Sequence, residues 1–137
     1  MPHLNIEIKA TCTELATVRA ILLSHQARFE GIDHQIDTYF HVPKGRLKLR
    51  EGNIENNLIH YLRDPEAGPK QSEVTLCPAI PGSGLKEALT RALGIKVVVD
   101  KQREIYFIEN VKFHLDTVAG LGTFVEIEAI ASAPDLE

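Results

Sequence analysis

The sequence predicts a mainly antiparallel β domain of the α+β class, closed into a barrel and flanked by two helices. Apolar and polar residues alternate with a period of two along about eight or nine short segments, as in β-strands with one apolar face. Only two segments have helical periodicity, and most connections are short enough to join antiparallel neighbours. A meander of many short strands favours a closed barrel, because closure leaves no exposed strand edge.

Strands are predicted along most of the chain. The sequence GRLKLRE at residues 45–51 shows the pattern best, because three cations alternate with two leucines. The residues just before it, Pro43, Lys44 and Gly45, predict a tight turn and therefore a hairpin with the preceding strand. The predicted strands are residues 4–10, 34–42, 45–51, 58–63, 70–77, 95–102, 103–109, 111–118 and 122–131.

Two helices are predicted between these strands. The first spans residues 11–29, where Thr11 and Glu14 have the spacing of a capping box and the apolar residues form a stripe. The second spans residues 83–94, with Ser83 as its N-cap and Gly94 as its C-terminal stop. Helices need an apolar surface to pack on, so we expect the apolar strand faces to point outward.

Composition limits the classes of partner. The 137 residues are 44% hydrophobic and 25% charged, which predicts one globular domain over residues 1–137. The net charge of −4 gives no general attraction to nucleic acid or to membrane surfaces, and no apolar run is long enough to span a bilayer. Cys12 and Cys77 form either one disulfide or two reduced thiols. Reduced thiols suit the cytoplasmic location that we expect, since no signal-peptide pattern is seen.

Charged residues are grouped on one face of several strands. Any one such face is compatible with an ordinary solvated sheet surface, but like charges side by side on a sheet destabilise it. Repetition on separate strands therefore favours a hydrated lumen, where cations balance carboxylates and bind a polyanion with a divalent metal ion. We expect bound phosphate to relieve the repulsion between the cations. The grouped residues are Glu7 and Lys9; Arg46, Lys48 and Arg50; Lys101 and Arg103; Lys112, His114 and Asp116; Glu126 and Glu128.

Five motifs follow one another along the chain: NIEIKA at 5–10, DTYFHVPKGRLKLRE at 37–51, GPK and a serine at 68–72, KQR at 101–103 and HLDTVAGLGTFVEIEA at 114–129. Together they resemble the CYTH family, the triphosphate tunnel metalloenzyme superfamily, which includes class IV adenylyl cyclases and thiamine triphosphatases. The resemblance implies an eight-stranded antiparallel tunnel that binds triphosphate compounds with Mg²⁺ or Mn²⁺. It also allows for a homodimer.

The resemblance implies roles for individual residues. The family signature E-x-E-x-K is altered here, because Asn5 stands where the first glutamate is expected, and we expect weaker metal binding at one position. The expected catalytic residues are Lys9, Arg50 and Asp116. The expected metal ligands are Glu7, Glu126, Glu128 and Asp116. The expected triphosphate-binding residues are Lys9, Arg46, Lys48, Arg50, Arg63, Lys70, Lys101 and Arg103.

Two reactions share this apparatus. In a cyclase the ribose 3′-hydroxyl attacks the α-phosphorus of ATP and pyrophosphate leaves, whereas in a triphosphatase water attacks the terminal phosphorus. Residues 37–51 most resemble the cyclase branch, so we expect a class IV adenylyl cyclase, with hydrolysis of inorganic or thiamine triphosphate as the alternative. Asn5 keeps open a third function, a weakly catalytic module that binds nucleotides or polyphosphate. His114 is either a general base or a hydrogen-bonded structural residue.

Overall fold

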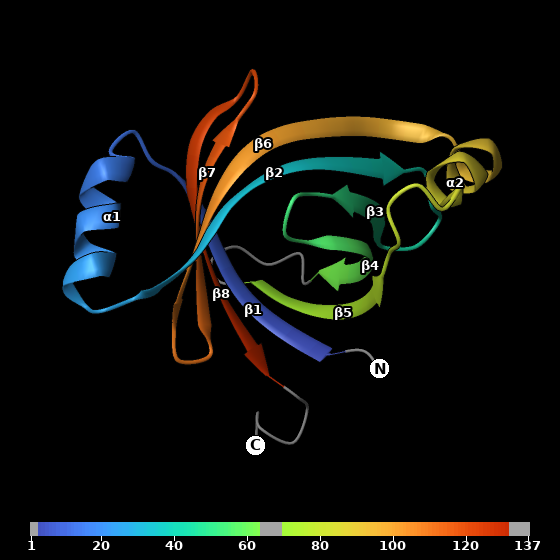
Figure 1. The fold of residues 1–137 in the computed structure, drawn as a ribbon. Helices are drawn as coiled ribbons and strands as arrows, with labels where there is room; N and C mark the ends of the chain where they lie inside the picture. The colour runs from blue at the N-terminus through green and yellow to red at the C-terminus, as the bar shows by residue number, and fades with distance from the viewer. Residues whose placement is uncertain (1–2, 64–69, 132–137) are drawn as a thin grey trace.

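The computed structural model describes residues 3–63 and 70–131, which form the predicted closed antiparallel barrel (Figure 1). Around the barrel the strand order is β1-β5-β4-β3-β2-β6-β7-β8, and β8 pairs back with β1. The eight-stranded prediction is therefore confirmed. The strands are β1 (His3–Thr11), β2 (Arg28–Phe40), β3 (Arg46–Glu51), β4 (Asn56–Arg63), β5 (Lys70–Pro78), β6 (Ile95–Ile108), β7 (Val111–Val118) and β8 (Gly122–Ala131).

The hairpin of β2 and β3 forms as predicted, and β6 differs from the prediction. Gly45 ends the turn with a φ of +69°, a conformation that glycine adopts without steric cost. The strands predicted at residues 95–102 and 103–109 are one continuous strand, β6, which pairs with β2 along almost its whole length. No glycine or proline interrupts residues 95–108, so they form one strand, although the register of its pairing with β2 shifts between Phe29 and Gly31 and between Tyr39 and Phe40.

The first helix, α1, is shorter than predicted and spans Leu15–Ser24. Thr11 belongs to β1, where it pairs with Phe124, so the predicted capping box is wrong, and the helix begins after Glu14 without a side-chain cap. The chain leaves the helix through Gln26 at a φ of +62°, and Arg28 already starts β2. Residues at both ends of the predicted helix are therefore paired in the sheet instead: Thr11 in β1, and Arg28 and Phe29 in β2. Leu22 packs into a buried cluster with Ala27, Tyr106 and Leu115.

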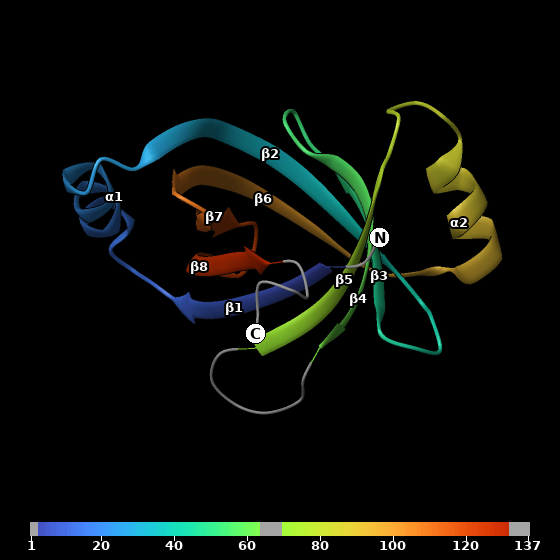
Figure 2. The ribbon, with the colours of Figure 1, turned by 90° about the horizontal axis from the view of Figure 1, so that it is seen from below.

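The second helix, α2, spans Leu85–Leu93 and lies at the opposite side of the barrel from α1 (Figure 2). Its N-cap is Gly84 in a left-handed conformation, so the prediction of Ser83 as N-cap is wrong, whereas Gly94 ends the helix as predicted. None of its residues is buried. Within the described ranges neither helix has the length or the apolar character to cross a membrane.

The interior of the barrel is polar and its outer wall is largely apolar. Ile6, Ile8 and Ile127 point outward and are at least 36% exposed. The polar and charged side chains buried inside are those of Asn5, Asp33, Gln35, Asp37, Thr38, Arg50, Ser72, Lys101, Arg103, His114, Asp116 and Glu126. The predicted charged lumen is therefore confirmed. Cys12 and Cys77 are free thiols, so the disulfide alternative is wrong.

Candidate functional site

One cavity of about 340 Å³ lies inside the barrel and brings together most of the predicted site residues. The predicted residues that line it are Glu7, Lys9, Arg46, Lys48, Arg50, Lys101, Arg103, Glu126 and Glu128. Asp116 does not line it but is fully buried behind Arg103. The side chains of Arg63 and Lys70 lie outside the described residues, although their backbones belong to β4 and β5.

A basic wall is formed by two strands that flank β2. Arg46, Lys48 and Arg50 project from β3, and Lys101 and Arg103 project from β6. The order β3-β2-β6 places the two groups on either side of a single strand. Period-two spacing on β3 and β6 keeps all five cations on the lumen face. The wall thus concentrates positive charge in a protein whose net charge is negative.

Asp37, on β2, is the centre of this wall and was not among the predicted site residues. Its side chain is fully buried and accepts two hydrogen bonds from Arg50, from Nε and Nη2, each 2.9 Å long. Lys101 Nζ donates to the same carboxylate at 3.1 Å, and Lys48 Nζ lies 3.7 Å from it. One carboxylate therefore holds three cations in position before any ligand arrives.

Burial affects the pKa values of this cluster strongly. Burial would raise the pKa of Asp37, but the hydrogen bonds and charge of Arg50 hold it far below its ordinary value. Burial, together with the neighbouring Arg103 and Arg50, lowers the pKa of Lys101 to about 8. Burial and Arg50 also lower the pKa of Lys48 well below its ordinary value. The arginines close to these two lysines disfavour the protonated, charged form of the lysines. A bound anion would favour that charged form and raise both pKa values.

Arg103 is fixed in the same way by a second buried carboxylate. Its Nε and Nη2 donate to the two oxygens of Asp116 at 2.8 and 2.7 Å, a bidentate pair. Nη2 also lies 3.6 Å from Glu126 Oε1. Asp116 therefore orients Arg103 in this structure, and its predicted role as a metal ligand stays a prediction.

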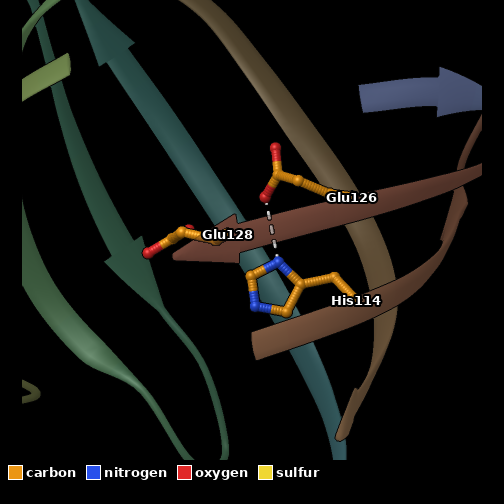
Figure 3. Close-up of side chains that lie close together, drawn as sticks. All are labelled: His114, Glu126 and Glu128. Carbon is orange, nitrogen blue, oxygen red and sulfur yellow. Dashed lines mark hydrogen bonds and ion pairs between the residues drawn. The ribbon is translucent and has the colours of Figure 1, made fainter. Parts of the chain in front are cut away.

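An acidic cluster, made of Glu7 on β1 and Glu126 and Glu128 on β8, lines the lumen beside His114 on β7. Figure 3 shows His114, Glu126 and Glu128. Glu126 and Glu128 lie two residues apart on β8, and Glu7 is paired opposite Glu128 on β1. His114 Nδ1 lies 2.9 Å from Glu126 Oε1, and Asn5 Nδ2 donates to Glu128 Oε1 at 3.0 Å. Ligand atoms of His114, Glu126 and Glu128 lie within 4.8 Å of one another. This spacing suits a single bound cation.

The electrostatics of the acidic cluster also favour a cation. Burial and the repulsion from Glu126 raise the pKa of Glu128, and Glu7 adds to this repulsion. Burial and the nearby Arg103 lower the pKa of His114 to about 3, so its ring is neutral and its Nδ1–H donates to the Glu126 carboxylate. The hydrogen bond from His114 and the charge of Arg103 outweigh burial and lower the pKa of Glu126. A divalent ion would neutralise the remaining like-charge repulsion.

Lys9 lies at the exposed edge of the cavity. Its Nζ is 5.3 Å from the centre of the Phe124 ring, and its backbone is paired opposite Glu126. It is therefore the most solvent-accessible of the predicted catalytic residues. The cation–π contact keeps its ammonium group near the acidic cluster.

Glu55 is a second lumen residue that the sequence did not predict. It lies in the turn between β3 and β4 and pairs with Lys112 across the barrel. Gln35 donates to it at 3.0 Å, and the charge of Lys112 outweighs burial and lowers its pKa to about 2. Asp33 holds the turn by accepting from the backbone N–H groups of Ile54 and Glu55. Glu55 could not be predicted from residue spacing, because a turn has no side-chain periodicity that shows which of its residues reach into the lumen.

The cavity also has an apolar and aromatic wall on β4 and β5. Ile59, Tyr61 and Val74 form a buried cluster there, and Leu76 lines the cavity beside it. Lys48 Nζ lies 5.4 Å from the ring centres of both Tyr39 and Tyr61. Phosphate oxygens need no such surface, whereas a planar organic group does.

Comparisons with known proteins agree with this architecture. The CYTH domain model matches residues 3–137, while no curated protein sequence matches the chain. The PH1012 protein of Pyrococcus horikoshii OT3 has a TM-score of 0.83 at 26% identity, covering 96% of this chain and 82% of its own. A candidate adenylate cyclase of Vibrio parahaemolyticus has a TM-score of 0.73 at 18% identity, with 99% and 82% covered.

A third solved structure is that of HpAC1 of Hippeastrum, an adenylyl cyclase candidate described as having a dominant triphosphatase activity. Its TM-score is 0.64 at 15% identity, and 98% of this chain and 81% of that chain are covered. At such identities the Vibrio and Hippeastrum proteins show a shared fold alone. The family model, in contrast, spans almost the whole sequence. The protein therefore belongs to the CYTH domain family.

Proposed function

We propose that this protein is a metal-dependent enzyme that acts on an organic triphosphate, and that its reaction is the conversion of ATP to cyclic AMP and pyrophosphate. The observation that carries the proposal is the opposition of two walls across one cavity. Five cations on β3 and β6 face the acidic cluster on β1 and β8. A triphosphate chain with a divalent metal ion complements both walls at once.

The basic wall would bind the phosphate chain. Asp37 and Asp116 compensate part of its charge, and Glu55 and Glu126 lie 3.5 and 3.6 Å from Arg50 and Arg103. Five cations against these four carboxylates still leave a positive surplus for an anion. Arg50 and Arg103 each donate two hydrogen bonds to a buried aspartate, and Arg50 also donates to Glu55 at 3.5 Å, so their remaining N–H groups are already oriented before substrate binds. Arginine offers phosphate a planar fork, and Lys48 and Lys101 add point charges.

The residues of the acidic cluster fit a divalent metal ion. Glu126 and Glu128, together with Glu7 and the amide of Asn5, would hold Mg²⁺ or Mn²⁺. When bound, the ion supplies positive charge that polarises a phosphoryl oxygen and stabilises the pentavalent transition state. Lys9 and Arg50 are the proposed catalytic residues that stabilise charge on the phosphate. Asp116 acts through Arg103 and is a positioning residue.

The apolar wall favours an organic triphosphate over inorganic triphosphate. Tyr61, Ile59 and Val74 are buried next to the basic wall, where the base or sugar of a nucleotide would pack. The adenylyl cyclase proposal rests on this wall and on the resemblance of residues 37–51 to the cyclase branch.

Triphosphate hydrolysis is the second candidate, favoured by one comparison. HpAC1 of Hippeastrum has the same fold and is described as an adenylyl cyclase candidate with dominant triphosphatase activity. The same two walls would serve hydrolysis if the terminal phosphorus lay beside the acidic cluster. A weakly catalytic binding module is the third, because Asn5 removes one charge from that cluster.

The experiment that separates these functions is product analysis. The purified protein is incubated with ATP, inorganic triphosphate and thiamine triphosphate, with Mg²⁺ or Mn²⁺, and the products are resolved by chromatography. Cyclic AMP with pyrophosphate supports the cyclase, and release of orthophosphate supports the triphosphatase. Binding without turnover supports the module, and no binding of any triphosphate refutes the proposal. Arg91→Glu on the exposed face of α2 is the control for a charge change outside the cavity.

A further inference from the structure

A buried hydroxyl group on β5 faces the cavity without a partner. Ser72 is 2% exposed and lines the cavity, yet among the described residues no group makes a hydrogen bond with its Oγ. We propose that Ser72 is a specificity-determining residue, which binds a sugar hydroxyl of the substrate and so selects a nucleoside triphosphate over inorganic triphosphate. The inference deepens the proposed function and rests on it in taking the cavity as the triphosphate site.

Ser72 lies between the acidic cluster and the apolar wall. Its strand, β5, has β1 on one side and β4 on the other (Figure 2). On the β1 side, Ser72 is paired opposite Asn5, whose amide donates to Glu128, and the Cβ atoms of the pair should lie about 5 Å apart. Val74 is the next lumen-facing residue of β5, about 7 Å along the strand, and it is paired opposite Tyr61 of β4. The hydroxyl group is therefore at the boundary between the proposed metal site and a surface suited to an organic group.

The sugar is the part of a nucleoside triphosphate that would reach this boundary. With the phosphate chain at the acidic cluster and the base packed on Tyr61 and Val74, the sugar that joins them lies beside Ser72. A serine hydroxyl both donates and accepts a hydrogen bond, as a sugar hydroxyl does, so the two can pair in either direction. The five cations of the basic wall are on β3 and β6, and neither strand is next to β5. Phosphate oxygens are therefore better matched by that wall than by Ser72.

The lack of a protein partner makes Ser72 able to discriminate between ligands. A ligand that leaves a buried polar group unpaired loses affinity relative to one that pairs with it. Inorganic triphosphate and a deoxy sugar both offer no hydroxyl to Ser72. Sites built to hydrogen-bond a substrate hydroxyl reject analogues that lack it, so selection here would act on the sugar.

The test compares ATP, 2′,3′-dideoxy-ATP and inorganic triphosphate by calorimetry in EDTA, which prevents metal-dependent turnover. The wild-type protein should bind ATP roughly tenfold more tightly than the dideoxy analogue. Ser72→Ala should weaken ATP binding by the same factor and leave the affinities for the other two ligands nearly unchanged. Thr75→Ala is the matched control, because it removes a hydroxyl from an exposed position on the opposite face of the same strand. It should keep the preference for ATP.

Three binding results would overturn the inference. They are equal wild-type affinities for ATP and the dideoxy analogue, a preference for ATP that persists in Ser72→Ala, and an equal loss of affinity for inorganic triphosphate in that variant. The first needs only the wild-type protein, so a variant that fails to fold does not remove the test.

Unfolding of the unliganded variant in urea gives a second readout. Because Oγ has no partner, Ser72→Ala should not lower the midpoint, and a lowered midpoint would assign Ser72 a structural role instead. Failure of the proposed function would appear differently, as absent turnover of ATP with metal while the preference for the sugar hydroxyl remains. The two failures are therefore distinguishable.

Discussion

Lys101 makes the binding of triphosphate dependent on pH. Its Nζ donates to Asp37 and is almost completely buried, and burial with the nearby arginines lowers its pKa from 10.5 to about 8. A phosphate chain bound at the basic wall would favour the ammonium form and return the pKa toward its ordinary value. Binding should therefore take up a proton above pH 8, and affinity should fall as the pH rises.

The size of the effect follows from the free-state pKa. At pH 7 nearly all Lys101 side chains are protonated, whereas at pH 9 about one in ten is. The dissociation constant should therefore rise about tenfold over this interval through Lys101 alone. Stability has the opposite trend. The folded pKa lies below the unfolded one, so the unfolded chain binds more protons between pH 8 and 10.5, and the unliganded protein should gain stability with rising pH in that range.

Calorimetry with inorganic triphosphate in EDTA measures the effect without turnover. Lys101→Arg is the matched control, because it keeps the charge and does not titrate in this range. Protonation of the ligand is common to both proteins and cancels in the ratio of their dissociation constants. That ratio, wild type over variant, should rise about tenfold from pH 7 to pH 9. Equal pH slopes for the two proteins would refute the assignment of the titrating group and its place beside the phosphate.

Three further predictions concern the basic wall and its turn. Lys48→Glu should weaken triphosphate binding by at least roughly 100-fold while Lys48→Arg is tolerated, because the reversal puts an anion 3.7 Å from the position of Asp37; equal calorimetric affinities for the two variants would contradict this. Asp37→Asn should lower the free energy of unfolding in urea by roughly 3–5 kcal/mol by leaving buried cations unpaired, and added triphosphate should restore more stability to the variant than to wild type. Gly45→Ala should cost about 1–2 kcal/mol in the same assay, because φ is +69° and the new Cβ would lie 2.6 Å from Tyr61 O; an unchanged midpoint would show that the turn relaxes.

Residue spacing predicted the barrel and its charged lumen for a simple reason. A strand has a side-chain period of two, so Arg46, Lys48 and Arg50 must share a face wherever the strand is placed. Leu47 and Leu49, which alternate with these cations, predicted that the opposite, apolar face of the strand packs outward. The same argument joined Glu126 to Glu128 and Lys101 to Arg103, and all of them line one cavity.

What spacing missed depends on contacts between strands that are distant in sequence. Asp37 shares a face with Gln35 and Tyr39, but its partners are on β3 and β6, and only the strand order brings them together. Glu55 reaches Lys112 across the lumen from a turn that has no periodicity. The predicted ends of the first helix were wrong for a related reason. Thr11 and Phe29 pair with neighbouring strands of the sheet, and a local sequence pattern cannot reveal such pairing.

The buried carboxylates change how substrate affinity should be understood. We expected the cations to repel one another until phosphate arrived, but Asp37 and Asp116 already pair with Arg50, Lys101 and Arg103. The unliganded wall is thus already held in shape, and little of the binding energy is spent on ordering it, although burial and the neighbouring arginines still lower the pKa values of Lys48 and Lys101. Affinity then comes from the positive charge that these carboxylates leave uncompensated. A wall built in this way releases product more readily than one in which five cations had no partner except the substrate.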